Sequence, residues 1–599
     1  VQDLFNLSQS LERKLGLARA ALLRQMLDEC GQALRDEKAR LHLVGYNDLL
    51  LNLDERLHSD KAPWLAAQLR RLFPVALIDE FQDTDPVQWE IFSSIYLPDL
   101  KAPKDPLFMV GDPKQAIYGF RSADLYTYLK ARNTAGHHYT LQRNQRSQAA
   151  LVKALNRLFG VNPDVFMLPG LHYHQVRSAD RTAEALRDPA SSAALQVWLL
   201  PQDDSGQGFR PIEQARQASA AAVAAEIARM LGQSGSQQVR IGHRGLNAKD
   251  IAVLVRTHAE GRRMRTALAQ HGVGSVERST QSVFLSSQAE QIEQLLTAVL
   301  EPTRDGLVRC ALATEAVGMN AAQIQALDED EAAYSLLAQQ FASLRHDWHE
   351  RGVGYMLRRW LQQQQVAERL LSRLDGERQL TNLLHLVEIL HQASALHPSP
   401  DSLLRWLRAQ RSKPDAHEQT LLRLESDENL VQIVTIHASK GLEYPIVFCP
   451  FLWRDPSAPQ GRLEGNVYHD EDGELVIDYR DGLDDQFDPE SIKFREWLER
   501  AAEFERLIYV ALTRAVHRCI LVAGCHGQPR SSKPVTNTLL NWIVAGKGVS
   551  PRQWRDQPVS ADQVHQSWSL LSSDSGGGIE VAQLPLPDGE LLQLQRPQG

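Results

Sequence analysis

The sequence predicts an α/β protein of two lobes, each built on a parallel sheet, with helical segments inserted between strands. Short apolar runs ending in polar residues alternate with helical stretches, an order typical of parallel sheets whose loops act at the strand ends. A long block without strands interrupts the second group of apolar runs, which predicts a helical insertion. The 599 residues suffice for roughly four units of about 150 residues each.

Composition narrows the classes of protein that remain. The hydrophobic fraction of 43% and the charged fraction of 23% are those of an ordinary globular protein. A net charge of −9 gives no overall basic signature, so any nucleic acid must bind in a local groove. The five cysteines show neither a CxxC pair nor zinc spacing, which predicts reduced thiols and a cytoplasmic location. No apolar run approaches the ~18–20 residues that span a membrane.

The first part of the chain predicts a helical segment and then a first α/β lobe. Residues 1–72 carry apolar residues at helical spacing among many charged ones. Residues 73–139 hold the strand candidates FPVALIDE (73–80) and PLFMVGD (106–112), and a third candidate, HYTLQ (138–142), crosses into the next lobe.

The rest of the chain predicts a second, interrupted lobe made of residues 140–285 and 429–530. Its strand candidates are ALQVWLLP (194–201), DIAVLVR (250–256), VQIVTIH (431–437), YPIVFCPFLW (444–453) and HRCILVAG (517–524). Residues 286–428 are amphipathic helices and form the insertion. HDEDGELVIDY (469–479) predicts a hairpin that turns at Asp472-Gly473. Residues 531–599 are rich in Ser, Gly, Pro and Gln, which predicts a loose C-terminal tail or linker.

Carboxylates crowd the end of the first strand candidate, in LIDEFQDTDPVQ (77–88). Asp79 and Glu80 match a Walker B layout, in which the Asp holds Mg²⁺ and the Glu acts as general base on the attacking water. The alternative is simple termination of a strand. Asp85 before Pro86 predicts a helix N-cap. Asp83 is open to three interpretations, as a cap, as the partner of a basic residue or as part of the site.

The loop after the next strand, GDPKQAIYGFRSADL (111–125), is expected at the same sheet edge. Gln115 is suited to hydrogen-bond a γ-phosphate or its water, and Arg121 to follow charge there. Tyr118 and Phe120 are suited to base stacking, which is worth ~1–3 kcal/mol per base. The alternative for both rings is that they fill the local core.

A third candidate segment, TLQRNQRSQAALVKALNRLF (140–159), predicts a helix with Ser147 as its N-cap. Arg146 comes just before this helix, at the boundary between the lobes. An arginine placed there can reach across a cleft to a γ-phosphate, a role worth ~10³–10⁵ in rate. The alternative for Arg146 is a surface ion pair.

Five segments in order resemble motifs II to VI of the UvrD/Rep-type superfamily 1 helicases. They are DEFQDTDPVQ, GDPKQAIYGFR, LQRNQRS, VQIVTIHASKGLEYPIVF (431–448) and ERLIYVALTRA (505–515). Over most of residues 40–525 the amino-acid sequence most resembles the RecB-like beta-subunit family of exodeoxyribonuclease V. The resemblance implies two RecA-like P-loop NTPase lobes, the first truncated and carrying residues 1–72 as the remainder of its inserted subdomain.

The resemblance also implies roles for the nucleotide-site residues, with ATP and Mg²⁺ as cofactors. Asp79 would hold the metal and Glu80 would be the catalytic base, as the residues themselves suggest. Gln115 would sense the γ-phosphate, while Arg146 and Arg514 would stabilise its charge. Glu443, in KGLE, would bind the ribose.

The resemblance further implies a DNA face. Tyr118, Phe120 and His437 would meet single-stranded DNA, and Tyr46, in GYNDLLL (45–51), would lie near it. A lone histidine is more often structural than functional, so only its motif favours His437. The turn that follows it, Ser-Lys-Gly, is small and basic, and is therefore suited to backbone phosphates.

The function implied is that of an ATP-dependent 3′–5′ DNA helicase subunit of a bacterial helicase–nuclease acting in double-strand break repair. The implied partners are single-stranded or duplex-end DNA and the gamma (RecC-like) and alpha (RecD-like) subunits. Two alternatives stay open, a non-catalytic DNA-binding scaffold with a helicase-like fold and a solitary UvrD-type repair helicase.

Two expected parts do not occur in the sequence. No G-x-x-G-K-[ST] phosphate loop is present, since the nearest string, AGKGVS (545–550), has Gly after Lys. VIDYRDG (476–482) has Arg where a D-x-K nuclease site needs Lys, so nuclease activity is not supported. We expect the phosphate loop before residue 1, a nuclease domain after residue 599, and these residues alone to be inactive.

Overall fold

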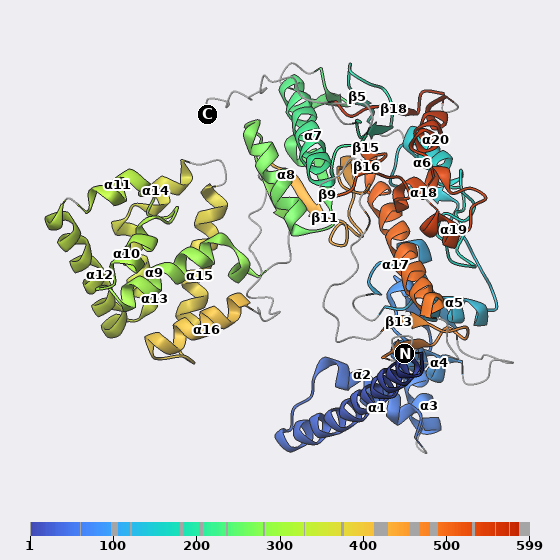
Figure 1. Cartoon of the computed structure of the whole chain (residues 1–599), viewed down its shortest axis with the longest axis horizontal. Helices are drawn as coiled ribbons and strands as arrows, with labels where there is room; N and C mark the ends of the chain where they lie inside the picture. The colour runs from blue at the N-terminus through green and yellow to red at the C-terminus, as the bar shows by residue number, and fades with distance from the viewer. Residues whose placement is uncertain are drawn as a thin grey trace. The chain divides into compact units, whose positions relative to one another are not determined.

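A computed structural model describes most of the chain. The described residues are 2–59, 62–97, 106–119, 123–179, 184–202, 208–234, 238–278, 282–328, 330–372, 376–412, 429–453, 455, 466–479, 489–529, 533–557, 559–573 and 576–585. The chain forms two compact units (Figure 1). The first comprises Val1–Leu246, Asp250–Arg263 and Ser439–Leu591, and the second comprises Asn247–Lys249, Met264–Ala438 and Leu592–Gly599.

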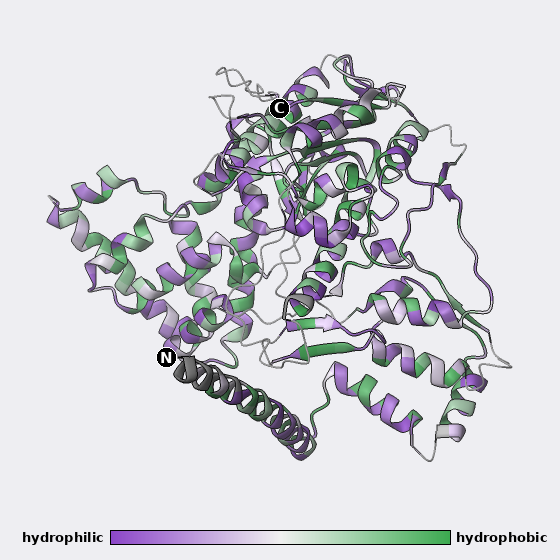
Figure 2. Cartoon of the chain, turned by 45° about the vertical axis from the view of Figure 1, so that its right-hand side comes forward, coloured by the Kyte–Doolittle hydropathy of each residue, from purple (hydrophilic) through white to green (hydrophobic). Residues whose placement is uncertain are grey.

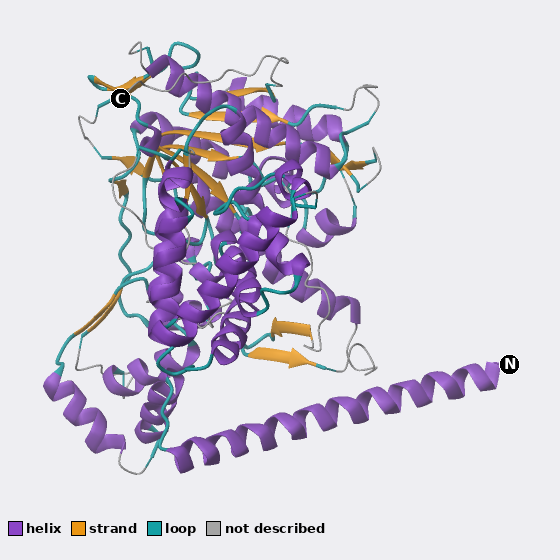
Figure 3. Ribbon diagram, turned by 90° about the vertical axis from the view of Figure 1, so that its left-hand side faces the viewer, coloured by secondary structure: helices purple, strands orange, loops and turns teal. Residues whose placement is uncertain are grey.

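The first unit begins with helices, as predicted for residues 1–72. They are α1 (Gln2–Leu41), α2 (Tyr46–Leu57) and α3 (Ala62–Leu72), and Figure 3 shows α1 as one continuous helix. β1 (Ala76–Ile78) then pairs in parallel with β2 (Leu107–Met109). A short 3₁₀ turn follows each strand, η1 (Phe81–Asp83) and η2 (Pro113–Gln115).

Two helices belong to this part of the unit, α4 (Pro86–Tyr96) and α5 (Leu125–Thr134). Asp85 caps α4 by accepting a hydrogen bond from the backbone N–H of Gln88, and Pro86 occupies the first turn. The predicted N-cap is therefore confirmed.

The β1–β2 pair has one covered face and one exposed face. Ala76 and Leu107 pack against a cluster that includes Leu57 and Ile91. On the opposite face, Leu77 is 75% exposed and Phe108 is 54% exposed. Parallel strands are normally covered on both faces, so this apolar surface is unusual.

Five parallel strands of one sheet lie at the centre of the first unit. They run in the order β9 (Ile251–Val255), β12 (Tyr444–Cys449), β15 (Ala515–Ala523), β6 (Leu195–Leu199) and β18 (Ile579–Gln583). β6 and β9 are buried along their whole length, which explains why their sequences are apolar except for the buried Gln196. The helices that accompany the sheet in sequence are α6 (Ala149–Phe159), α7 (Ile212–Ser234), α8 (His258–Gln270) and α17 (Pro489–Leu512).

Short strands make up the remaining pairings of this unit. β3 (Arg143–Asn144) pairs with β4 (Arg177–Ser178), β7 (Arg240–Ile241) lies between β5 (Leu186–Arg187) and β8 (Arg244–Gly245), and β16 (His526–Gly527) pairs with β17 (Pro534–Val535). β13 (Asn466–His469) and β14 (Leu475–Asp478) are antiparallel, with Gly473 at φ 79° in the turn, which confirms the predicted hairpin.

Two local predictions near residue 140 are wrong. The run HYTLQ forms no strand, and Tyr139 and Leu141 are 92% and 88% exposed, so burial does not hold it extended. Ser147 does not cap α6, because its hydroxyl donates to the carbonyl oxygen of Ala515 at 2.7 Å. Gln148 occupies the N-cap position and makes no side-chain capping bond.

The prediction of a loose tail is wrong for residues 533–585. They form α18 (Leu539–Ala545), α19 (Pro551–Asp556), α20 (Ala561–Ser573) and β18, which pairs with β6 in the central sheet. Trp542, Trp554 and Trp568 are fully buried, so this segment has a core despite its polar composition.

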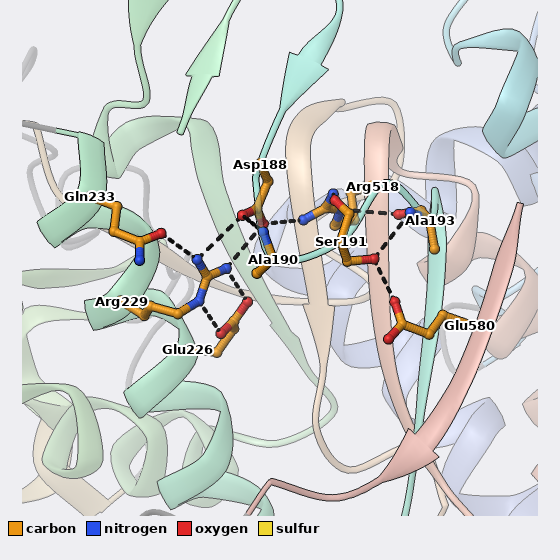
Figure 4. Close-up of polar contacts among 9 residues, drawn as sticks. All are labelled: Asp188, Ala190, Ser191, Ala193, Glu226, Arg229, Gln233, Arg518 and Glu580. Carbon is orange, nitrogen blue, oxygen red and sulfur yellow. Dashed lines mark hydrogen bonds and ion pairs between the residues drawn. The ribbon is translucent and has the colours of Figure 1, made fainter. Parts of the chain in front are cut away.

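A buried ion cluster ties one loop of this unit to two of its elements (Figure 4). The side chain of Asp188 has no exposed surface. It accepts a hydrogen bond from Arg229 of α7 at 3.0 Å and another from Arg518 of β15 at 2.5 Å. The same loop reaches β18, because the hydroxyl of Ser191 donates to Glu580 at 2.5 Å.

The second unit is mainly helical. β10 (Ser275–Arg278) pairs in parallel with β11 (Val431–Thr435), and η5 (Val283–Leu285) precedes the helices. The helices are α9 (Ser287–Leu300), α10 (Asp305–Leu312), α11 (Ala321–Ala326), α12 (Glu331–Arg351), α13 (Val353–Gln363), α14 (Val366–Leu371), α15 (Gly376–Ala393) and α16 (Pro400–Ser412). Hydrophilic and hydrophobic residues are mixed along these helices (Figure 2). Their buried apolar side chains share one core.

The predicted α/β class with parallel strands and inserted helices is thus confirmed. The predicted domain boundaries stay a prediction. Among the described residues, no helix is both long and apolar enough to cross a membrane.

Candidate functional site

The acidic end of β1 is held in an unusual backbone conformation. Glu80 has φ 51°, in the left-handed region that non-glycine residues rarely adopt. Its backbone N–H donates to Oδ1 of Asp79 at 2.9 Å, and both side chains are exposed. Such strain gathers at functional sites, and here it sets the direction of the two carboxylates that sequence predicts to hold metal and activate water.

Gln82 joins the ends of β1 and β2. The residue is 1% exposed, its side-chain amide donates to Oε2 of Glu80, and its side-chain carbonyl oxygen accepts a hydrogen bond from the backbone N–H of Asp112 at 2.9 Å. The two loops therefore lie side by side at one sheet edge, as predicted.

The loop after β2 has its own polar network around Asp112. Lys114 Nζ lies 2.6 Å from Oδ1 of Asp112, and the side-chain amide of Gln115 donates to Oδ2 at 3.1 Å. Gln115 and Tyr118 are both half-buried. Gln115 is therefore oriented by a carboxylate close to the end of β1.

Arg146 and Glu443 meet beside the start of β15. Nε of Arg146 lies 3.2 Å from Oε2 of Glu443, and Nη1 donates to the carbonyl oxygen of Thr513 at 3.3 Å. The predicted γ-phosphate arginine and the predicted ribose carboxylate are thus direct neighbours, next to the residue that precedes Arg514.

Arg514 is a buried guanidinium without a carboxylate partner among the described residues. It is 1% exposed, and its donors reach the carbonyl oxygens of Val510 at 2.9 Å and Leu442 at 3.4 Å, and Oγ1 of Thr513 at 3.1 Å. Burial and the nearby charge of Arg146 lower the pKa of Arg514 to about 10. A buried cation held only by neutral oxygens is suited to receive an anion.

The structure adds one residue that sequence reasoning did not assign, Lys440. Its Nζ lies 2.5 Å from Oδ2 of Asp83 and 3.5 Å from Oε2 of Glu80, and it faces the ring of Tyr118 at 4.9 Å from the centroid. Of the three interpretations of Asp83, the structure shows the pairing with a basic residue. The only signal for Lys440 in the sequence is the basic Ser-Lys-Gly turn, which by itself suits DNA phosphates.

The other predicted DNA residues are not brought together. Tyr46 is 91% exposed at the start of α2 in the first unit. His437 is half-buried after β11 in the second unit. Phe120 and Arg121 lie outside the described residues.

The carboxylates at the end of β1 and the guanidinium groups beside the start of β15 have the chemistry of a magnesium–triphosphate site, and the charge of Glu80 acts on Arg514. Asp79 and Glu80 are exposed carboxylates, the kind of ligand that Mg²⁺ takes together with phosphate oxygens. Arg146 and Arg514 supply guanidinium groups that suit phosphate oxygens. Within the described ranges, no group of three or more His, Cys, Asp or Glu side chains is placed to hold a metal.

Two protein-family models together match most of the chain. The UvrD/REP helicase N-terminal domain matches residues 2–136, and the UvrD-like helicase C-terminal domain matches residues 139–523. The chain belongs to the UvrD-like helicase family. The second match contains Arg146, Glu443 and Arg514, and the first contains Asp79 and Glu80.

Within this family the chain is RecB-like. It is 40% identical over 513 residues to the RecBCD enzyme subunit RecB of Escherichia coli K12, covering 84% of this chain and 42% of that protein. It is 36% identical over 493 residues to RecB of Haemophilus influenzae KW20, covering 81% and 39%. It is 34% identical over 593 residues to RecB of Mycobacterium tuberculosis H37Rv, covering 97% and 51%. The chain thus spans about two fifths to half of the length of these curated relatives.

Proposed function

We propose that this chain is the motor region of an ATP-dependent DNA helicase subunit of the RecBCD type, moving 3′ to 5′ in double-strand break repair. The observation that carries the proposal is Arg514, a buried guanidinium with neutral oxygens as partners beside the Arg146–Glu443 pair. A cation in that position needs an anion, and a nucleotide triphosphate supplies it.

The residues around β1 divide the work of hydrolysis. Glu80 would accept the proton of the attacking water, and Asp79 would hold the metal, which supplies positive charge beside the phosphates. Gln115 contacts the γ-phosphate or its water, and Arg121 contributes further positive charge. When bound, magnesium and ATP supply the charged phosphoryl group on which these residues act.

The arginines complete the nucleotide site. Arg146 and Arg514 stabilise negative charge on the γ-phosphate, because guanidinium groups match phosphate oxygens in geometry. Glu443 binds the ribose, and its place beside Arg146 supports a role for both in one nucleotide site.

The DNA face uses aromatic side chains. Tyr118 and Phe120 stack on bases of a single strand, and His437 and Tyr46 contact the same strand. The exposure of Tyr46 supports this assignment, since a free ring in water gains by stacking.

A phosphate loop is needed beside these residues, and none of the 599 residues forms a G-x-x-G-K-[ST] string. The exposed apolar face of β1 and β2, with Leu77 and Phe108, supports its being covered by a further segment of the same fold. We therefore expect the 599 residues alone to bind ATP weakly. A nucleotide titration that gives micromolar affinity with steady turnover would contradict this.

The test of the motor function is Glu80→Gln in the full-length protein. ATP hydrolysis should fall by at least about a thousandfold while single-stranded DNA binding stays within about twofold, because only the base is lost. Glu55→Gln, an exposed glutamate on α2, is the matched control and should change neither. Turnover that survives Glu80→Gln would remove the assigned base.

The proposed partners are the gamma and alpha subunits of an exodeoxyribonuclease V assembly in a bacterial cytoplasm. The relatives carry the name of the RecBCD enzyme, which supports this choice. Affinity purification should recover both subunits. Recovery of an active helicase without them would favour a solitary UvrD-type enzyme, and DNA binding without hydrolysis would favour a scaffold.

A further inference from the structure

Lys440 touches three groups to which the proposed function gives different tasks. Its ammonium contacts the acid Asp83, the proposed base Glu80 and the proposed DNA-stacking ring of Tyr118. The Lys440 side chain is only 5% exposed, so water cannot replace a lost partner. A buried ammonium must stay paired, and weakening one contact therefore strengthens its dependence on the others.

Asp83 is the fixed anchor of this ammonium. The Nζ–Oδ2 distance is 2.5 Å, and the Asp83 side chain is 22% exposed. Oδ1 of Asp83 is buried without a hydrogen-bond partner among the described residues. Asp83 thus depends on Lys440, and this contact is the one that should persist.

Glu80 is the partner that can be released. Its Oε2 lies 3.5 Å from the ammonium, and its side chain is 56% exposed. The same oxygen accepts a hydrogen bond from the side-chain amide of Gln82, so the ammonium and the amide together hold the carboxylate turned towards themselves. In this arrangement Glu80 is held back from its proposed task.

Tyr118 is the group through which DNA can act on Lys440. The attraction of an ammonium to a ring face increases when water is removed from the ring. A base stacked on Tyr118 removes that water. The ring then competes more strongly with Glu80 for the ammonium, while the shorter contact to Asp83 is kept.

We propose that Lys440 is a positioning residue that releases Glu80 when DNA stacks on Tyr118. This inference rests on the proposed function, because it uses Glu80 as the base and Tyr118 as the stacking ring. It makes Lys440 the physical link between the DNA face and the nucleotide site, within one unit of the chain.

The first test measures binding of fluorescein-labelled oligo(dT) to the full-length protein without nucleotide, by anisotropy. Lys440→Met should weaken binding about two- to fivefold, the usual range for loss of a cation–π pair. In a Tyr118→Leu background the same change should have no further effect. Lys114→Met is the matched control, because Lys114 faces the ring of Tyr509, and it should add to Tyr118→Leu independently. Additive effects of Lys440→Met and Tyr118→Leu would overturn the inference.

The second test measures ATP hydrolysis with and without oligo(dT). Lys440→Met should raise hydrolysis without DNA about threefold or more, since a donor leaves the base, and should reduce stimulation by DNA. Lys440→Arg should restore stimulation. If Lys440→Met folds poorly, the double variant Lys440→Met/Asp83→Asn removes the unpaired buried charge and serves instead.

The outcomes separate the two claims. No hydrolysis by the wild-type protein, with its partners and DNA present, would overturn the proposed function and this inference with it. Hydrolysis that DNA stimulates equally in wild type and Lys440→Met would overturn the inference alone.

Discussion

The guanidinium of Arg146 and the carboxylate of Glu443 meet at 3.2 Å although 297 positions separate them in sequence. Their side chains are 29% and 57% exposed, so as an ion pair they contribute only ~0–1 kcal/mol to stability. We therefore expect this contact to matter for positioning two nucleotide-binding groups rather than for the stability of the fold.

Glu443→Ala should accordingly separate stability from nucleotide binding. We expect the free energy of unfolding to change by less than about 1 kcal/mol, and the KM for ATP to rise about tenfold through loss of a charged hydrogen bond. Denaturant unfolding and steady-state hydrolysis by the full-length protein measure the two quantities. A large loss of stability with an unchanged KM would show that the Arg146–Glu443 pair is purely structural.

The left-handed backbone of Glu80 predicts a difference between two variants that both lack its carboxylate. Glycine adopts φ 51° freely and alanine does not, so Glu80→Gly should be more stable than Glu80→Ala by about 1 kcal/mol. Neither should hydrolyse ATP. Parallel urea titrations make the comparison, and equal stabilities would show that the strain is absent in solution.

Among these substitutions, Asp188→Ala should cause the largest loss of stability. Asp188→Ala would leave the buried guanidinium of Arg518 without its carboxylate, which costs about 3–5 kcal/mol, whereas the half-buried Arg229 keeps Glu226. Glu301→Ala breaks an exposed pair with Arg304 and should cost about 0–1 kcal/mol, which makes it the control. Unfolding followed by tryptophan fluorescence should rank the two variants, and similar losses would contradict the buried cluster.

His469 predicts a pH dependence of stability. Burial by itself lowers the pKa of His469, but hydrogen bonds and charge from Asp124 and Glu499 outweigh it and raise the pKa to about 9. Because the folded pKa exceeds the ordinary value of 6.5, the stabilisation is complete below about pH 6.5 and is lost as pH rises through about 9.

The measurement is the difference in free energy of unfolding between wild type and His469→Gln across this window. The difference should be largest near pH 6 and shrink towards pH 9.5. A difference that stays constant with pH would show that His469 is not charged in the folded chain.

Much of the local structure follows from the sequence. The apolar runs at 76–78, 107–109 and 251–255 are strands where predicted. Asp85 caps α4, and the hairpin turns at Gly473. These features depend on residues a few positions apart, through periodicity, capping and turn geometry, which is why the sequence alone predicts them.

Two of the failed predictions come from long-range contacts. Ser147 is a good cap by its type, but Ala515 offers its hydroxyl another partner 368 positions away. The polar segment 533–585 folds because β18 finds β6, and composition cannot show that pairing.

The sequence by itself determined the chemistry of this chain, the acids at the end of β1 and the order of the motifs, because each motif is a short run of residues with its own local geometry. Only the tertiary structure decided which charges meet. Lys440 lies 357 positions from Asp83, and nothing in the intervening sequence specifies that the folded chain buries one against the other.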